Sequence, residues 1–411
     1  MKQQSSLPRL LLFIFCALWC AGLMLSSAAA PRAFAQTVQM PQDAERQHAI
    51  ELWEQSKFTE ALPLLEKLAA KNGDDIAILS RLGFAIYATT AMIKDPQERQ
   101  QRRSRALTIL QHSQELGDDS NLTKLAVDAL SSNDPTDIPF SKIREAEQAI
   151  RDGEAAFVKG ELDKALAHYE RALRLDPKLY EAALYAGDMY FKKGYAATDP
   201  AVKSEQMNKA GEWFARAIAI TQDRETAHRY WGDALMALGK QDEARAKFVE
   251  AIIAEPYNRG AYVGLTQWAE HNNVSLGHPQ IKVPDEAGAE AAGNWTIYKK
   301  TREAWADGRF NKEFPTEKAY RHSLREEAEA LRLVAEAAAK ESQSDRTKSL
   351  DPSLASLVKL NQAGLLEAYI LFAHPDAGIA RDYAAYRQAN RDKLRRYWKE
   401  FVIQDKQTAT P

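Results

Sequence analysis

The chain repeats a block of its own sequence 104 residues later, and a period of 34 residues runs inside each block. The small or turn-forming residues that recur at this distance are Ala49/Gly153, Ala61/Ala165, Gly83/Gly187, Pro96/Pro200 and Ala106/Ala210. Periods of this length are typical of paired helices, because each pair leaves an apolar face that only the next pair can cover. The sequence therefore predicts an all-α solenoid of stacked helical hairpins.

The clearest unit runs from Ala146 to Pro177. Small and large side chains alternate along it at Gly153, Phe157, Gly160, Ala165, Tyr169, Ala172 and Pro177. This stretch resembles the tetratricopeptide (TPR) repeat, and the resemblance implies a TPR-type solenoid with a right-handed superhelix. We expect Gly153 and Ala165 to be small because the two helices of the pair cross there.

Five such units can be identified, and the second and fourth carry eleven extra residues between their helices. Each insertion contains an Asp-Pro step, Asp95-Pro96 or Asp199-Pro200. Equal length and equal placement indicate that a two-repeat unit was duplicated whole. The insertions are either matched projections on one edge of the solenoid that grip a partner or an inherited loop with a helical extension and no contact role.

The remaining organisation follows from changes in composition along the chain. Residues 272–293 are rich in Gly, Pro and Ala, which predicts a linker, and the helical segments beyond lack the small-residue pattern. The predicted segments are a signal peptide (1–35), a first TPR pair with a bend segment (36–139), a second TPR block with a capping helix (140–272), a linker (273–293), a C-terminal helical region forming a small bundle (294–405) and a tail (406–411).

The first 35 residues predict export. Lys2 and Arg9 precede an apolar run from Leu10 to Leu25, and the segment ends in the small residues typical of a cleavage site before Gln36. A retained membrane anchor is the alternative. Both cysteines of the chain lie in the apolar run, so cleavage would leave none, and removing three positive charges would change the net charge from -2 to -5. We expect a periplasmic or secreted protein, and no nucleic-acid partner, because no concentrated basic surface is present.

The resemblance to TPR proteins implies that the first helix of each pair lines a concave groove. The residues that would line it are Arg151, Glu154, Phe157, Tyr185, Asp188, Phe191, Arg229, Tyr230 and Asp233. Some family members hold a peptide carboxylate with Asn and Lys, whereas three acids stand here where an Asn is expected. The groove therefore favours a basic and apolar protein or peptide partner. The alternative is that the acids form a solvated face and the tyrosines pack between helices.

Catalysis has less support in the sequence. His271 and His278 lie close together, but the linker around them has no cysteine and no recognisable ligand spacing, so we expect no metal and no cofactor. A short helical stretch is crowded with titratable groups and is either an acid/base cluster or the charged side of an exposed helix: Tyr320, Arg321, His322, Arg325, Glu326 and Glu327. An enzyme site in this region would gain support if Tyr320, His322 and Glu326 lined a deep pocket with His374.

Together these features predict an exported, non-enzymatic TPR scaffold that mediates protein–protein interactions in the bacterial cell envelope. An assembly factor for envelope polysaccharide or cell wall is the first alternative, and an enzyme with its site in the C-terminal region is the second. The basic segment Arg387–Lys399 has two interpretations. It either binds an anionic membrane or cell-wall polymer, or it is the solvent-exposed side of a helix whose other side is apolar.

Overall fold

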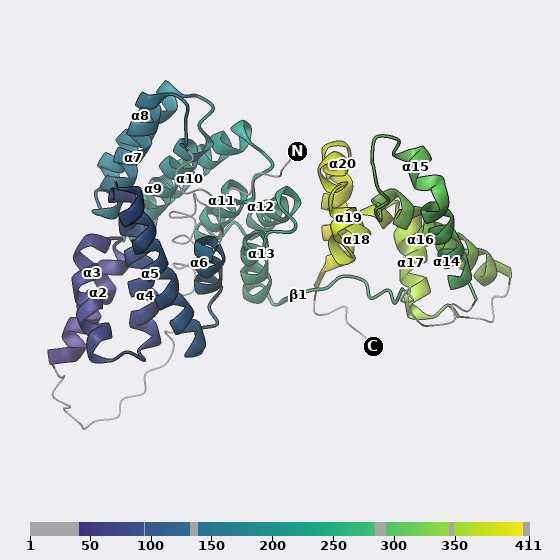
Figure 1. Ribbon diagram of the computed structural model, residues 1–411, viewed down its shortest axis with the longest axis horizontal. Coiled ribbons are helices and arrows are strands. Elements are labelled where there is room, and N and C mark those ends of the chain that lie inside the picture. Colours follow the sequence, from purple (N-terminus) through teal and green to yellow (C-terminus); the bar gives the residue numbers. More distant parts are fainter. Residues whose placement is uncertain (1–40, 94, 132–138, 284–292, 345–348, 406–411) are drawn as a thin grey trace. The chain divides into compact units, whose positions relative to one another are not determined.

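A computed structural model describes residues 41–93, 95–131, 139–283, 293–344 and 349–405 (Figure 1). The predicted signal peptide and tail lie outside these residues. The chain divides into two compact units, Met1–Gly264 and Leu265–Pro411, and the division falls inside helix α13. Within the described residues, no helix combines the length and the apolarity needed to cross a membrane.

Where the structure describes it, the first unit is built from helices joined by short turns. Figure 1 shows them stacked as successive hairpins, and neighbouring hairpins pack through α3 on α4, α8 on α9 and α10 on α11. Their bounds are α2 Pro41–Glu54, α3 Phe58–Lys71, α4 Ile76–Thr89, α5 Pro96–Glu115, α6 Asn121–Ser131, α7 Arg144–Val158, α8 Leu162–Leu175, α9 Tyr180–Ala196, α10 Pro200–Ile220, α11 Glu225–Ala237, α12 Gln241–Ala254 and α13 Gly260–His271.

The structure explains why glycine stands at the helix crossings. A Cβ atom on Gly187 in α9 would lie 2.6 Å from Cε1 of Phe214 in α10. The same clash would arise between Gly153 and Tyr169, and between Gly232 and Phe248. The predicted helix crossing is therefore present in three successive hairpins, with an aromatic ring of the second helix seated on the glycine of the first.

The two insertions lengthen the second helix of their hairpins. Helices α5 and α10 contain 20 and 21 residues, whereas α3, α8 and α12 each contain 14. Each long helix begins at the proline of the Asp-Pro step, and the preceding aspartate accepts hydrogen bonds from the next two free backbone amides. The insertions are thus helical extensions with a strong start signal.

The two duplicated blocks meet through equivalent turns. Ser56 between α2 and α3 and Gly160 between α7 and α8 stand 104 residues apart, and both have positive φ, 60° and 75°. Lys57 pairs with Lys159 in an antiparallel bridge, a register in which Ser56 stands opposite Gly160. The first hairpin therefore contacts the third hairpin, and not only its neighbour along the chain.

The second unit is also helical apart from a two-stranded antiparallel sheet. Strand β1 (Val274–Leu276), from the segment predicted as a linker, pairs with the chain's last described residues, β2 (Ile403–Asp405). Its other elements are α14 Trp295–Ala304, a π-helical turn η4 Trp305–Arg309, α15 Phe310–Glu313, α16 Leu324–Ser344, α17 Pro352–Ala363, α18 Leu366–Ala373, α19 Ala377–Ala380, α20 Tyr383–Tyr397 and a second π-helical turn η5 Trp398–Val402.

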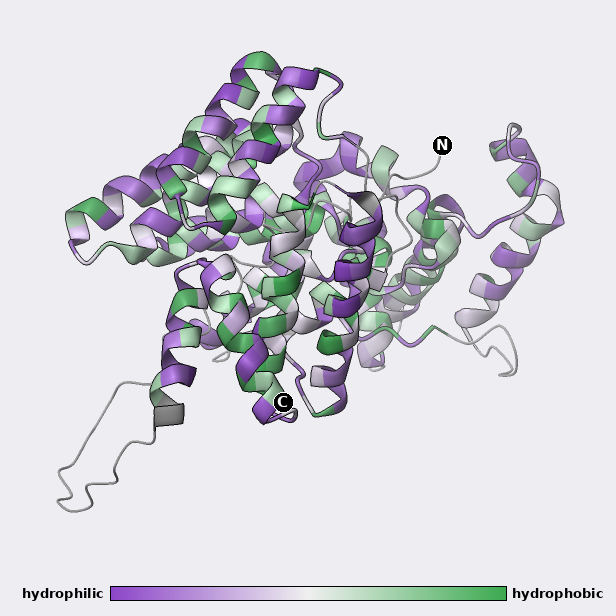
Figure 2. Ribbon diagram, turned by 60° about the vertical axis from the view of Figure 1, so that its left-hand side comes forward, coloured by the Kyte–Doolittle hydropathy of each residue, from purple (hydrophilic) through white to green (hydrophobic). Residues whose placement is uncertain are grey.

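Hydrophobic and hydrophilic residues alternate along most helices of both units, as Figure 2 shows. The second unit has its own core, in which Trp305, Leu331, Leu357, Tyr369 and Tyr397 are fully buried. Apolar side chains at helical spacing thus explain both units.

Candidate functional site

The predicted groove residues belong to α7, α9 and α11, the first helices of three successive hairpins. Glu154, Asp188 and Asp233 each follow the glycine of the helix crossing, so they occupy equivalent positions. Their spacing arises because the repeat brings the same helical face to the same place in each hairpin. Of the nine predicted residues, only Arg151 keeps a substantial exposed fraction, 35% of its side chain.

The aromatic members of the predicted groove pack inside the first unit. Phe157, Tyr185, Phe191 and Tyr230 are each no more than 3% exposed. The ring of Tyr185 meets Tyr169 edge-on at 5.3 Å between centroids, and Tyr230 meets Phe214 at 5.8 Å. The tyrosines therefore pack between helices, the arrangement that the sequence left open as the alternative.

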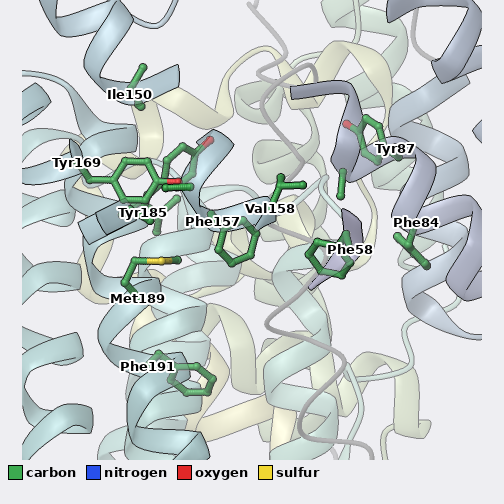
Figure 3. Close-up of a cluster of buried hydrophobic side chains, with 14 of the residues drawn as sticks. Phe58, Phe84, Tyr87, Ile150, Phe157, Val158, Tyr169, Tyr185, Met189 and Phe191 are labelled. Atoms are coloured by element: carbon green, nitrogen blue, oxygen red, sulfur yellow. The ribbon is translucent and has the colours of Figure 1, made fainter. Parts of the chain in front are cut away.

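Phe157 has a partner that the periodicity did not indicate. Its ring lies 6.1 Å from that of Phe58 at the start of α3, as Figure 3 shows. The ammonium group of Lys192 lies 5.4 Å from the centroid of Phe157 on the α9 side. The first hairpin thus covers the α7 end of the predicted groove through the contact between the two duplicated turns.

A row of ion pairs, which we name the paired row, runs along the same helices. Glu147 accepts a hydrogen bond from Arg151 at 2.6 Å, Glu181 from Arg224 at 2.8 Å, and Glu225 from Arg229 at 2.9 Å. Sequence reasoning missed its acids. The i,i+4 spacing of Glu147 and Glu225 from their arginines was the available signal.

The acids seven or eight residues further along form a second row, the inner row, which consists of Glu154, Asp188 and Asp233. All three are buried, so they do not form the solvated face considered above. Burial raises the pKa of Glu154 to about 7, although Arg151 acts to lower it. Burial likewise raises the pKa of Asp233 to about 7 against the opposing charge of Arg229. Among the described residues, no cation lies within ion-pairing distance of Glu154 or Asp233, which explains why both are easily protonated.

The acid/base residues predicted in the C-terminal region do come together. Tyr320 donates a hydrogen bond to Oε1 of the buried Glu326 at 2.8 Å, and His322 lies 3.1 Å from Oε2 of the adjacent Glu327. The ring of His374 packs 5.2 Å from Tyr369, and burial lowers its pKa against the opposing charge of Glu327. The hydrogen-bond partners of the clustered side chains are therefore mainly one another and the neighbouring Arg302.

The candidate metal ligands are above all the two histidines at the predicted linker. In the part of the chain that the structure describes, no three His, Cys, Asp or Glu side chains are grouped so that they could hold a metal ion. His278, one of the linker histidines, instead contacts the hydroxyl of Tyr397 through Nδ1 at 2.7 Å.

Comparison with known proteins identifies a TPR repeat in the first unit. A family model described as TPR repeat matches residues 153–194, the stretch from Gly153 in α7 to Gly194 in α9 that includes five of the nine predicted groove residues. No protein of curated function matches the chain.

Several solved structures are similar to parts of the chain. The first TPR of Spaghetti (RPAP3), bound to the HSP90 peptide SRMEEVD, is 20% identical, with 33% of this chain and 98% of that chain covered, at a TM-score of 0.28. The TPR domain of Arabidopsis OM64 is 21% identical, with 32% and 99% covered, at 0.27. The MamA protein is 18% identical, with 52% and 92% covered, at 0.25.

Proposed function

We propose that this chain, a tetratricopeptide-repeat protein with an all-α fold, is an exported scaffold that binds protein partners in the bacterial cell envelope. The observation that carries the proposal is the stack of equivalent first helices, α7, α9 and α11, which places an acidic residue at the same repeat position three times. A repeated surface suits an extended peptide, because each hairpin can contact one stretch of it. A fold of this kind serves many ligands, so the partner's chemistry has to be argued from the residues.

Two acids of the inner row, Glu154 and Asp233, favour a basic partner. The chain supplies an arginine to each acid of the paired row, but Glu154 and Asp233 have no ion-pair partner among the described residues. A lysine or arginine of a partner would provide the missing charge. A carboxylate partner would instead add a like charge beside them.

Binding should require a change of conformation. Glu154 and Asp233 are 6% and 5% exposed, so a partner contacts them only after this face of the helices opens. We therefore expect association slower than that of a preformed groove. Export rests on the expected signal peptide, and fractionation of cells expressing the full chain tests it: recovery in the cytosol alone would contradict it.

The decisive experiment is affinity capture from envelope extract. Replacing Tyr185 or Tyr230 by Ala would empty buried ring sites and damage the fold. The better variant is Glu154→Gln, Asp188→Asn and Asp233→Asn, which keeps the shape of each side chain and removes its charge. We expect this triple variant to lose basic protein partners that the parent retains.

The matched control carries the same chemical change on exposed acids. Asp163→Asn with Asp242→Asn suits this purpose, because these side chains are 83% and 87% exposed. The control should capture the same partners as the parent. If the triple variant also does so, the inner row is not the binding surface, and capture of glycan fragments in place of proteins would favour the polysaccharide alternative.

A further inference from the structure

The imidazole of His322 in the second unit is held between two carboxyl groups from different elements. Its Nδ1 lies 2.6 Å from Oδ2 of Asp376, which precedes α19. Its Nε2 lies 3.1 Å from Oε2 of Glu327 in the first turn of α16. Neutral imidazole has a single N–H, so only the protonated ring can donate to both oxygens. The geometry therefore describes an imidazolium that links α16 to residues 374–382, which we name the α19 corner.

The charges around His322 also require a second cation. Glu326 is fully buried and Glu327 is 4% exposed. Arg302 from α14 is their partner, with Nε 2.6 Å from Glu326 and Nη1 3.3 Å from Glu327. With Asp376 the cluster holds three carboxylates, and Arg302 supplies one positive charge. Protonated His322 supplies the second, which lowers the cost of burying this much negative charge.

The two carboxyl groups differ in what they can do without the histidine. Asp376 has a side chain that is 47% exposed, and its other oxygen accepts hydrogen bonds from the amides of Gly378 and Ile379. Glu327 is buried, and its Oε2 also accepts from the hydroxyl of Tyr298 at 2.8 Å. Water can replace the imidazole at Asp376 but hardly at Glu327. A neutral His322 that keeps its one N–H on the buried Glu327 releases the exposed Asp376 to water.

We propose that His322 is a proton-operated latch, which fastens the α19 corner to the beginning of α16 when protonated and releases Asp376 when it loses its proton. The latch regulates the second unit and is independent of partner binding by the repeats. A second attachment does not titrate in this range: Arg321 donates from Nη1 to the carbonyl of Gly378 at 2.9 Å and from Nη2 to Asp382 at 2.6 Å. Deprotonation therefore loosens the corner without detaching it.

The pKa of His322 supports this direction. Burial and the charge of Arg302 act to lower it, whereas the hydrogen bonds to Glu327 and Asp376 act to raise it, and the net shift is upward from 6.5. The latch is fully closed below the ordinary pKa of histidine and opens as the pH rises through the elevated value. Each unit of elevation corresponds to about a tenfold preference for the protonated, closed form.

Two measurements on the full chain test the latch. NMR titration gives the pKa of each of the eight histidines, and the signal missing from His322→Gln identifies this one. Hydrogen exchange, corrected for the intrinsic rate at each pH, reports on residues 374–382. We expect a pKa for His322 above 6.5 and a several-fold rise in exchange of the corner across that titration.

Matched variants separate the latch from a merely structural role. Asp376→Asn keeps an oxygen to cap α19 but removes the charge, so it should lower the pKa of His322 and flatten the pH profile of exchange. His112→Gln on α5, a site 46% exposed and 3.5 Å from Glu115, should change neither. A pKa of His322 at or below 6.5, or corner exchange that follows the same pH profile in parent and Asp376→Asn, would overturn the proposal.

Discussion

The helix crossing at Gly187 allows a sharp test of the packing, through Gly187→Ala. The new Cβ would stand 2.6 Å from Cε1 and 2.7 Å from Cδ1 of Phe214, whereas ordinary contacts are 3.4–4 Å. Relieving the closer contact needs a shift of 3.4 − 2.6 = 0.8 Å. Phe214 has little room for it, because the ring is fully buried and Tyr230 packs edge-on at 5.8 Å.

Two opposing effects set the size of the loss. Overpacking a close-packed core costs about 1–3 kcal/mol. Replacing Gly by Ala inside a helix returns about 1 kcal/mol through helix propensity. Since the overlap at Gly187 is large, we expect the upper part of the first range and a net loss of about 1–2 kcal/mol. For a unit of this size, that corresponds to a fall in Tm of roughly 2–8 °C.

Thermal unfolding of the full chain, followed by circular dichroism, measures the effect. Gly73→Ala is the control, because nothing lies within 4 Å of its Cβ position, and it should leave Tm nearly unchanged. Adding Phe214→Leu to Gly187→Ala should make the pair less harmful than the sum of the single changes. Two results would contradict this reasoning: a Tm of Gly187→Ala equal to that of the parent, or losses of stability that simply add in the double variant. Either would mean that the ring of Phe214 does not limit the approach of α9 and α10.

Two further predictions concern buried charge. Arg302→Met should destabilise the second unit by about 3–5 kcal/mol in urea unfolding, because Glu326 and Glu327 would lose their shared arginine; a loss below about 1 kcal/mol would contradict the pairing. In the first unit, burial raises the pKa of Glu154 and Asp233 to about 7. Their contribution to stability is therefore present below the unfolded pKa values near 4 and is lost as the pH rises through 7. The urea midpoint should fall over that window, and Glu154→Gln with Asp233→Asn should flatten the profile.

Local pairing made most of the first unit predictable. Gly153 and Tyr169 are only 16 residues apart, and their contact follows from one hairpin folding on itself. The starts of α5 and α10 were not predicted, although the Asp-Pro steps held the signal, because an aspartate cap and a proline at the first helical position act within one turn. Contacts of this kind depend on spacing, and spacing is visible in a sequence.

The meeting of the two blocks depends on a contact that spacing does not reveal. The 104-residue period shows that Ser56 and Gly160 occupy equivalent positions in the two blocks. It does not show whether the two turns lie far apart along the stack or contact each other directly. The antiparallel bridge from Lys57 to Lys159 is a long-range pairing, with no period of its own. Phe157 was therefore predicted as a groove residue, although Phe58 of the first hairpin covers it.

Long-range contacts also explain why the sequence could not show which acids of the predicted groove have an arginine partner. The arginine that neutralises Glu181 is Arg224, 43 residues away in the segment before α11. Only the folded stack shows that the paired row already has its cations, while Glu154 and Asp233, equivalent in repeat position, have neither an arginine nor a lysine within ion-pairing distance in the described chain. The basic partner that we propose would therefore gain little at the paired row and more at Glu154 and Asp233, on which the charges of Arg151 and Arg229 act only from a greater distance.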